Sequence, residues 1–226
     1  MRDFSDNASC VDYKPSYNIA PQAFTPVLKH SSSHEIEYYD LKLMKWGLKV
    51  SSFKPEQGIH NARLETLTDK PSFRYPLAAG QTCVVVAEGF FEWKQHKNPY
   101  YITPKNEVMP LLLMAGLYTI NDKGQYSYTV ITTESNFQIK PIHHRMPVIF
   151  TDPDDVHSWL HISKSDSTHA IELLHAITKK LESTESFDLF PVSPQVNNTA
   201  NDTRYNVMPL AQTPASKMFD NFLIKK

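Results

Sequence analysis

The chain has 226 residues, enough for one domain of ordinary size with a sizeable core. Its 41% hydrophobic and 12% aromatic content excludes a disordered protein, and its net charge of -1 excludes a global attraction to nucleic acid or membranes. Only Cys10 and Cys83 are present, which argues against a disulfide framework and favours a reducing compartment. The polar N-terminus predicts no signal peptide, and no apolar run is long enough for a transmembrane helix.

The predicted elements, taken in chain order, are mostly strands. Residues 1–16 are polar and aperiodic, and we expect them to be disordered or to mark a truncated N-terminus. Strands are predicted at residues 23–28, 41–46, 82–87, 100–103, 111–120, 126–132, 148–150 and 188–192. Helices are predicted at about residues 60–67, 153–160 and 168–181. Residues 213–226 are predicted to be a flexible tail.

These elements indicate an α+β fold, because strands outnumber helices and do not alternate with them. We expect one domain over residues 17–212, with a mostly antiparallel sheet that curls toward a barrel and a few flanking helices. Pro26 interrupts the first strand, which predicts an edge position for it. No phosphate-binding loop, dinucleotide-binding motif or serine-hydrolase motif occurs, and no spacing fits a zinc site, so no cofactor or metal is expected.

The stretch from Cys83 to Trp93 carries the first candidate residue. Its apolar part predicts a strand buried on both faces, and Gly89 permits a sharp change of direction after it. Glu92 follows between Phe91 and Trp93. Aromatic crowding desolvates a carboxylate and raises its pKa, as a general acid requires. The alternative is a carboxylate that points from a pleated strand into water.

Three further groups carry polar or aromatic candidates. His143 lies between Pro141 and Pro147 and can act as an acid or base, or it can belong to a solvated surface loop. Asn61 and Arg63 are two residues apart, so an extended segment turns both to one side. They suit amide hydrogen bonding and phosphate binding, or a helix cap and a solvated arginine. Trp46 can stack on a base or belong to the core.

The order of these motifs carries more information than any one of them. They are Tyr17-Asn18-Ile19-Ala20-Pro21, Met44-Lys45-Trp46-Gly47-Leu48, Asn61-Ala62-Arg63-Leu64-Glu65-Thr66, Glu88-Gly89-Phe90-Phe91-Glu92-Trp93, Met114-Ala115-Gly116-Leu117-Tyr118, His143-His144-Arg145-Met146-Pro147, and Val192-Ser193 with Val196-Asn197-Asn198. This succession resembles the SRAP (SOS-response-associated peptidase) family over residues 17–210.

The resemblance implies a DNA-repair function. Family members bind single-stranded DNA in a positively charged groove and form a covalent link to abasic sites. Their nucleophile is an N-terminal cysteine, whose α-amine and thiol condense with the sugar aldehyde to a thiazolidine. Lyase and self-processing peptidase activities are implied as well. The expected partner is single-stranded DNA with abasic sites, without a membrane or small-molecule cofactor, and we expect a monomer in the nucleus or otherwise the cytoplasm.

The resemblance also assigns roles to individual residues. The candidate catalytic residues are Asn61, which would hydrogen-bond the N-terminal cysteine and its adduct, Glu92, which would move protons, and His143, which would stabilise the opened sugar. The candidate DNA-binding residues are Arg63 and Arg145 for phosphates, and Trp46, Asn18 and Pro21 for the shape of the DNA path.

The chain departs from the family pattern at its start. Family members begin Met-Cys-Gly-Arg, whereas this chain begins Met1-Arg2-Asp3, and Cys10 lies only seven residues before Tyr17. We expect the printed chain to lack the nucleophile, through truncation of a gene product or true loss, and we favour truncation. Trp46-Gly47-Leu48 also lacks the family's following proline and second tryptophan. The rival hypotheses are a single-stranded DNA-binding module without chemistry and a peptidase that uses Glu92 and His143.

Overall fold

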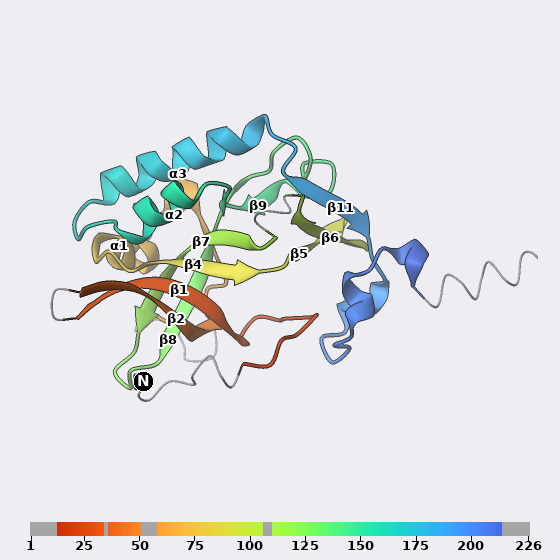
Figure 1. Ribbon diagram of the computed structural model, residues 1–226, viewed down its shortest axis with the longest axis horizontal. Helices are drawn as coiled ribbons and strands as arrows, with labels where there is room; N and C mark the ends of the chain where they lie inside the picture. Colours follow the sequence, from red (N-terminus) through yellow and green to blue (C-terminus); the bar gives the residue numbers. More distant parts are fainter. Residues whose placement is uncertain (1–12, 34–35, 51–57, 106–109, 214–226) are drawn as a thin grey trace, which may run out of the picture.

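The computed structural model describes residues 13–33, 36–50, 58–105 and 110–213. In these ranges the chain forms a large curled sheet, a smaller three-stranded sheet and three α-helices (Figure 1). The expected α+β class with a curled, mostly antiparallel sheet is confirmed. Residues 1–12 of the expected N-terminal segment and 214–226 of the expected tail lie outside the described residues.

Five strands of the large sheet close into a ring. They are β1 (Phe24–Ser33), β2 (Ile36–Trp46), β4 (Thr82–Ala87), β7 (Leu112–Ile120) and β8 (Tyr126–Glu134). β7 pairs with both β4 and β8, β8 pairs with β2, and β1 joins β2 to β4. Every pairing in the ring is antiparallel except β2 with β8. Closure leaves each of these strands with a partner on both sides, as in a small barrel.

Strand alternation divides the apolar residues between the inside and the outside of the barrel. Cys83 and Val85 of β4 turn inward and join a core that includes Val27 and Met44. Val84, between them, turns outward and joins the core under the helices. All three β4 residues are buried, which confirms the prediction of a strand covered on both faces.

Three helices cover the outside of the barrel (Figure 1): α1 (Pro71–Ala78), α2 (Pro153–Leu160) and α3 (Ser167–Glu182). The Asp152 side chain caps α2 by accepting the Asp154 N–H, and Pro153 occupies the first turn, as predicted. Trp159 of α2 is fully buried and donates its indole N–H to the carbonyl of Cys83 at 2.9 Å. No helix among the described residues is long and apolar enough to cross a membrane.

Two predictions about local structure are wrong. Residues 60–67 form the short strand β3 (Asn61–Arg63) and the 3₁₀ turn η2 (Leu64–Thr66) instead of a helix, because β3 pairs in parallel with β8. β1 is not an edge strand, since it lies between β2 and β4. Its ladder with β4 is limited to Val27 and Leu28, so the missing N–H of Pro26 falls outside that ladder.

The smaller sheet has the order β11–β6–β5. It consists of β5 (Phe90–Lys94), β6 (Asn98–Pro104) and β11 (Phe187–Pro191). Three 3₁₀ turns follow β11: η3 (Pro194–Asn197), η4 (Arg204–Val207) and η5 (Leu210–Gln212). The large sheet is completed by β9 (Arg145–Pro147), which pairs with β8, and by β10 (Ile149–Phe150), which pairs with β7.

Candidate functional site

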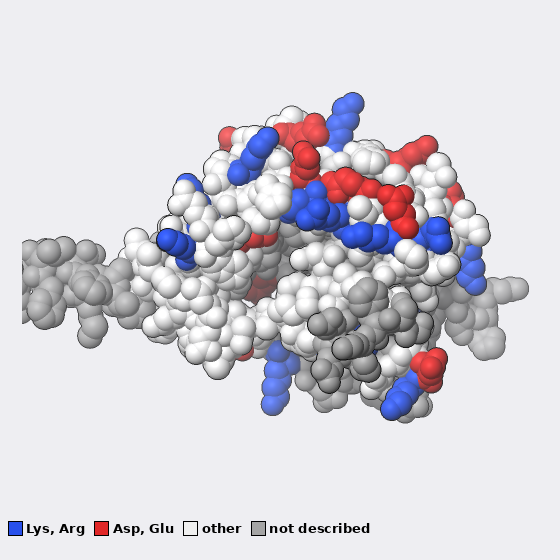
Figure 2. All heavy atoms as spheres, turned by 180° about the vertical axis from the view of Figure 1, so that it is seen from behind, with Lys and Arg blue, Asp and Glu red and all other residues white. Residues whose placement is uncertain are grey.

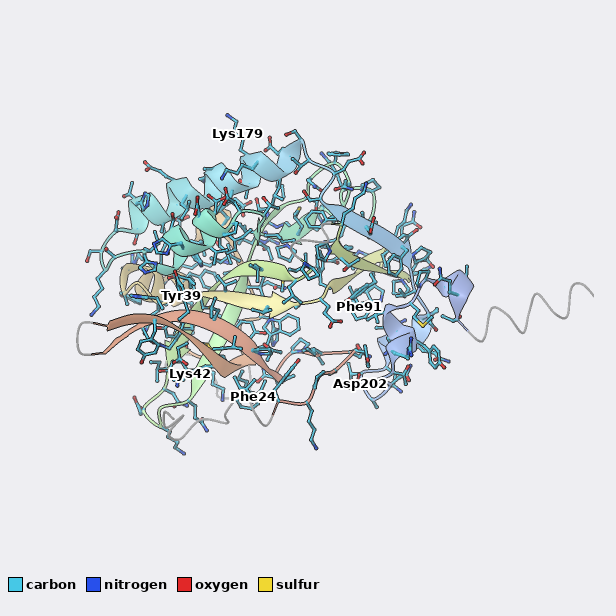
Figure 3. The ribbon with its side chains drawn as sticks, in the orientation of Figure 1. Phe24, Tyr39, Lys42, Phe91, Lys179 and Asp202 are labelled. Carbon is cyan, nitrogen blue, oxygen red and sulfur yellow. The ribbon has the colours of Figure 1, made fainter. Side chains whose placement is uncertain are left out.

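Glu92 lies on β5, and strand alternation decides what surrounds it. Phe91 and Trp93 turn to the face that packs against the residues after β11, in a small core with Tyr101 and Val196. Figure 3 shows Phe91 on the side of the molecule that also carries Asp202. Phe90 turns the opposite way and packs against the barrel core. Glu92 shares the face of Phe90, so the aromatic neighbours expected from the sequence lie on the other face of its strand.

Glu92 meets His143 in the structure. Their Oε1 and Nδ1 atoms are 3.5 Å apart, and 23% and 25% of the two side chains are exposed, so the pair is largely desolvated and still open to a ligand. Burial raises the pKa of Glu92, and a protonated His143 and the backbone N–H of Trp93 oppose that rise. A carboxyl with a raised pKa beside an imidazole can donate and accept protons near neutral pH.

The backbone of Arg145 holds the ring of His143. Nδ1 of His143 lies 3.1 Å from the carbonyl oxygen of Arg145 and 3.3 Å from its backbone nitrogen. Nδ1 is therefore contacted both by the backbone of Arg145 and by the carboxyl group of Glu92. Within the described ranges Nε2 of His143 makes no hydrogen bond, which leaves that nitrogen for a ligand.

The side chain of Arg145 is occupied by protein groups. Its Nη1 and Nη2 donate to the two carboxylate oxygens of Glu65 at 2.7 and 3.0 Å. Nη2 also donates to the carbonyl oxygen of Thr132 at 2.6 Å and to its hydroxyl at 3.2 Å. These hydrogen bonds lower the pKa of Glu65. The guanidinium expected to contact phosphate is thus held in a bidentate ion pair across β8.

Asn61 and Arg63 share one face of β3. Both are exposed and Ala62 between them is buried, which confirms the expectation that they face one side. Neither side chain has a hydrogen-bond partner among the residues that the structure describes. Arg63 lies near enough to Glu65 to help lower the pKa of that carboxyl. β3, which carries both residues, pairs with one side of β8, and β9, which carries Arg145, pairs with the other side. β8 therefore lies between these two residues and Arg145.

Trp46 and Gln22, the residue after Pro21, both contact His60. The indole N–H of Trp46 donates to the carbonyl of His60 at 3.0 Å, and the two rings meet edge to face. Pro21 and Gln22 form a tight turn in which Gln22 has a φ of 76°, the signature of a type II turn. The Gln22 amide contacts the His60 ring at 3.2 Å, and burial lowers the pKa of His60.

Asn18 is placed elsewhere, at the junction with the end of the described chain. It is 8% exposed, and its amide nitrogen lies within 3.0–3.1 Å of the carbonyls of Val196, Asn198 and Asn201. The backbone N–H of Tyr17 donates to Asp202 at 2.6 Å. The Asn18 amide therefore fastens the N-terminal segment to the turns after β11 and has its donors engaged within the protein.

The cysteines and metal ligands limit the chemistry of the described residues. Cys83 is fully buried in the barrel, and burial raises the pKa of its thiol, so it is not an accessible nucleophile. Cys10 lies outside the described residues. Across residues 13–33, 36–50, 58–105 and 110–213, no three His, Cys, Asp or Glu side chains form a group suited to a metal ion.

Sequence reasoning missed two residues of this region, Glu65 and His60. Each lies next to a motif that it had singled out: Glu65 is two residues after Arg63, and His60 directly precedes Asn61. Their partners are distant in the chain, which is why spacing alone did not reveal them. Figure 2 shows the rear face with basic side chains in a band above a central hollow, interspersed with acidic ones.

Comparison with known proteins places the chain in a family. The family model described as SOS response associated peptidase (SRAP) matches residues 1–199. The abasic site processing protein HMCES of Gallus gallus is 34% identical over 235 residues, covering 88% of this chain and 67% of its own length. HMCES of Xenopus tropicalis is 36% identical, with 84% and 65% covered. The chain thus spans about two thirds of these vertebrate relatives.

A bacterial relative and two crystal structures extend the similarity. The abasic site processing protein YoqW of Bacillus subtilis (strain 168) is 34% identical over 204 residues, with 85% of each chain covered. A protein from Bacteroides thetaiotaomicron has a TM-score of 0.60 at 27% identity, covering 83% of this chain and 82% of that one. A protein from Bordetella bronchiseptica, with a TM-score of 0.61 at 20% identity, covers 77% of this chain and 86% of that one and shares the fold.

Proposed function

This chain belongs to the SRAP family, and from that premise we propose that it binds single-stranded DNA and captures abasic sites by a covalent bond in the response to DNA damage. The relatives named as abasic site processing proteins in vertebrates and in Bacillus subtilis support this substrate class. In this proposal the protein acts as a monomer, in the nucleus or otherwise in the cytoplasm.

The contact between Glu92 and His143 is the observation that carries the proposal. An abasic deoxyribose must open from its cyclic hemiacetal to an aldehyde before an amine can attack it. Ring opening moves a proton from the hydroxyl at C1 and delivers one to the ring oxygen. A carboxyl of raised pKa next to an imidazole, 3.5 Å away, suits this exchange of protons.

Capture then follows from elementary carbonyl chemistry. A primary amine adds to the aldehyde carbon, and the carbinolamine loses water to give a Schiff base. A neighbouring thiolate adds to the C=N carbon, the nitrogen takes up a proton, and the product is a thiazolidine with no net oxidation. Glu92 would protonate the departing hydroxyl, and the Asn61 amide would hydrogen-bond the amine or its adduct.

Arg63 and the aromatic wall would hold the DNA. Arg63 is exposed and its guanidinium has no partner in the described part of the chain, so it can take a phosphate without breaking a protein contact. Trp46, the Pro21 turn and His60 would shape the path of the strand beside Asn61. Arg145 would contribute positive charge to this groove from its pair with Glu65.

A single-stranded DNA-binding module without covalent chemistry is the second candidate. The state of the cysteines favours it: Cys83 is enclosed in the barrel, so the thiol for ring closure has to come from outside the described residues. Cys10 is the other cysteine of the chain.

Incubation with an abasic oligonucleotide tests both candidates. The chain is mixed with single-stranded DNA that carries one abasic site and then run on a denaturing gel, with a tetrahydrofuran analogue as the matched control because it cannot open to an aldehyde. Covalent capture predicts a shifted band, with the abasic DNA only, for a variant of the chain that carries an N-terminal cysteine. The chain as printed, with Met1-Arg2 in that place, should give no such band, because a thiazolidine needs the α-amine and the thiol of one residue and Cys10 is internal.

Binding without a shifted band, also with the N-terminal cysteine in place, would support the binding module. The affinity of this protein for both oligonucleotides would then be similar and would fall with salt. Failure to bind either oligonucleotide at low salt would contradict both candidates.

A further inference from the structure

We propose that Glu65 is a positioning residue which, through Arg145, determines which imidazole nitrogen of His143 carries the proton. The inference rests on the proposed function in one respect, because the use of His143 at an abasic sugar belongs to that proposal. The clamp is the ion pair of Glu65 with Arg145 together with the hydrogen bond from Arg145 to Thr132. It is a property of the folded protein, and its effect on His143 can be measured without DNA.

The clamp joins two segments that are distant in the chain. Glu65 and Arg145 are 80 residues apart in the chain and come from opposite sides of β8. Both carboxylate oxygens accept from the guanidinium, and the same guanidinium donates to the backbone carbonyl and the hydroxyl of Thr132. Only 14% of the Arg145 side chain is exposed. The two terminal nitrogens face four acceptor atoms, and Nη2 shares its two hydrogens among three of them, which leaves this arginine little freedom.

The backbone of Arg145 connects the clamp to the imidazole ring of His143. The backbone N–H and C=O of Arg145 both face Nδ1 of His143, and Glu92 approaches the same nitrogen. The Arg145 carbonyl, the nearest of the three groups at 3.1 Å, accepts a hydrogen bond from Nδ1–H, and Glu92 accepts one when it is ionised, whereas the Arg145 N–H at 3.3 Å donates one. This environment favours the neutral tautomer with the proton on Nδ1, so that Nε2 presents a lone pair to a ligand.

The side chain of a free histidine prefers the proton on Nε2 in water. The protein must therefore hold the 143–145 segment in place to keep the less common tautomer. Backbone hydrogen bonds hold this segment at His143, whose N–H donates to the carbonyl of Ile139 at 3.0 Å, and at His144, whose carbonyl accepts from Ser135 at 3.1 Å. The clamp to Glu65 and Thr132 adds a side-chain anchor at Arg145, the first residue of the three-residue strand β9. Without the clamp, the contact between Nδ1 and the Arg145 carbonyl loses one of its supports.

Lysine cannot replace arginine in this clamp. An ammonium group carries the same charge, but it lacks the planar fork that reaches both carboxylate oxygens and the Thr132 carbonyl together. A phosphate-binding role would tolerate lysine at position 145 better than the clamp would. This difference separates the two roles of Arg145.

Nitrogen-15 NMR of the imidazole side chains is the test, on the full chain without DNA at a pH where His143 is neutral. The variants are Glu65→Gln and Arg145→Lys, which break the clamp from opposite sides, so that one decides if the other fails to fold. The matched control is Glu134→Gln, because Glu134 lies directly across from Arg145 in the β8–β9 register and makes no ion pair with it.

The parent and Glu134→Gln should show His143 protonated mainly on Nδ1. In Glu65→Gln and Arg145→Lys the ratio of the Nδ1–H to the Nε2–H form should fall about fivefold, the effect of weakening one hydrogen bond. An unchanged ratio in a folded clamp variant would overturn the proposal, and so would an equal fall in Glu134→Gln.

Binding to single-stranded DNA separates this proposal from the proposed function. Glu65→Gln should bind at least as tightly as the parent, because it removes a negative charge beside Arg63. A parent that does not bind DNA, together with a shifted tautomer in the variants, would refute the function and leave the clamp standing. The reverse result would refute the clamp alone.

Discussion

At the residue scale, the two acidic groups of the site are held in opposite electrostatic states. Glu92 is desolvated and its pKa is raised, whereas Glu65 receives two hydrogen bonds from Arg145 and its pKa is lowered. The first arrangement favours the protonated carboxyl and the second favours the carboxylate. The same residue type is thus suited to proton transfer at position 92 and to anchoring at position 65.

Replacement of Glu92 by Gln should stabilise the protein at neutral pH. Because the folded pKa of Glu92 lies above its unfolded value, its contribution to stability is present at low pH and is lost as the pH rises through the folded pKa. The melting temperature of Glu92→Gln relative to the parent should therefore be raised at pH 7.5, and the gain should shrink as the pH falls toward about 4. Thermal unfolding across this range measures it.

Glu65→Gln is the control of opposite sign. Its folded pKa is depressed, so its stabilisation is present above the unfolded pKa and is lost as the pH falls through the folded pKa. This variant should melt below the parent at pH 7.5, with a deficit that shrinks in acid. A shift of the melting temperature in the same direction in both variants at pH 7.5 would contradict the assignment of the two environments.

At the element scale, Gly89 determines how β4 passes into the smaller sheet. A Cβ at this position would overlap the ring of Tyr101 and lie 2.6 Å from the carbonyl oxygen of Ile102, so β5 and β6 approach too closely for any side chain. Gly89 does not have a positive φ. The glycine is therefore needed for the close approach of two strands, where the sequence had suggested a change of direction.

Gly89→Ala should destabilise the protein by about 2 kcal/mol or more, since the obstacles include backbone and a packed ring. Gly124→Ala is the matched control. Gly124 has a φ of 74° in the β7–β8 hairpin with open space around it, so its replacement should cost only about 1 kcal/mol of backbone strain. Urea unfolding of both variants compares the two costs, and equal losses would argue against a steric role for Gly89.

The elements that could be predicted from the sequence are those whose signals are local. The capped start of α2 and the apolar run of β4 appear where their patterns indicate. α1 was missed because Pro71 suggested an end, although proline suits the first turn of a helix. β3 was taken for a helix because its parallel pairing depends on β8, which lies about seventy residues later.

In the candidate site, too, the features with local sequence signals could be predicted and those that depend on distant segments could not. The shared face of Asn61 and Arg63 was predictable, because alternation is a local property. The desolvation of Glu92 was predicted in the right direction, but Phe91 and Trp93 face away from it. The pairing of Arg145 with Glu65 was not predictable, because two distant segments meet only once β8 has both of its neighbours.

At the scale of the whole molecule, the first described segment lies beside the turns after β11 (Figure 1). Asn18 joins the two through its side-chain amide. Loss of its amide leaves three carbonyls without their donor, one of them in a buried contact. Asn18 thus supplies the side-chain amide of this junction, and the contact of the Tyr17 N–H with Asp202 adds to it.

Asn18→Ala should lower the free energy of unfolding by about 1–3 kcal/mol, the cost of leaving buried acceptors unpaired. Hydrogen exchange should quicken in residues 13–23 and 194–207 more than in the barrel. Asn198→Ala is the matched control, because it keeps the backbone carbonyl that Asn18 contacts and removes only a local bond to Ala200. A similar loss in Asn198→Ala would place the effect in the turn itself.

The contact between Glu92 and His143 joins the smaller sheet to the large sheet, and the strands of these two sheets alternate along the chain. Glu92 belongs to the smaller sheet, whose strands come from residues 90–104 and 187–191, while His143 lies in the segment leading to a strand of the barrel sheet. Every contiguous piece that holds the whole smaller sheet also includes β7, β8 and the helices between. The contact between Glu92 and His143 therefore cannot be transplanted as a module, because a chain segment that carried the smaller sheet would bring part of the larger sheet with it.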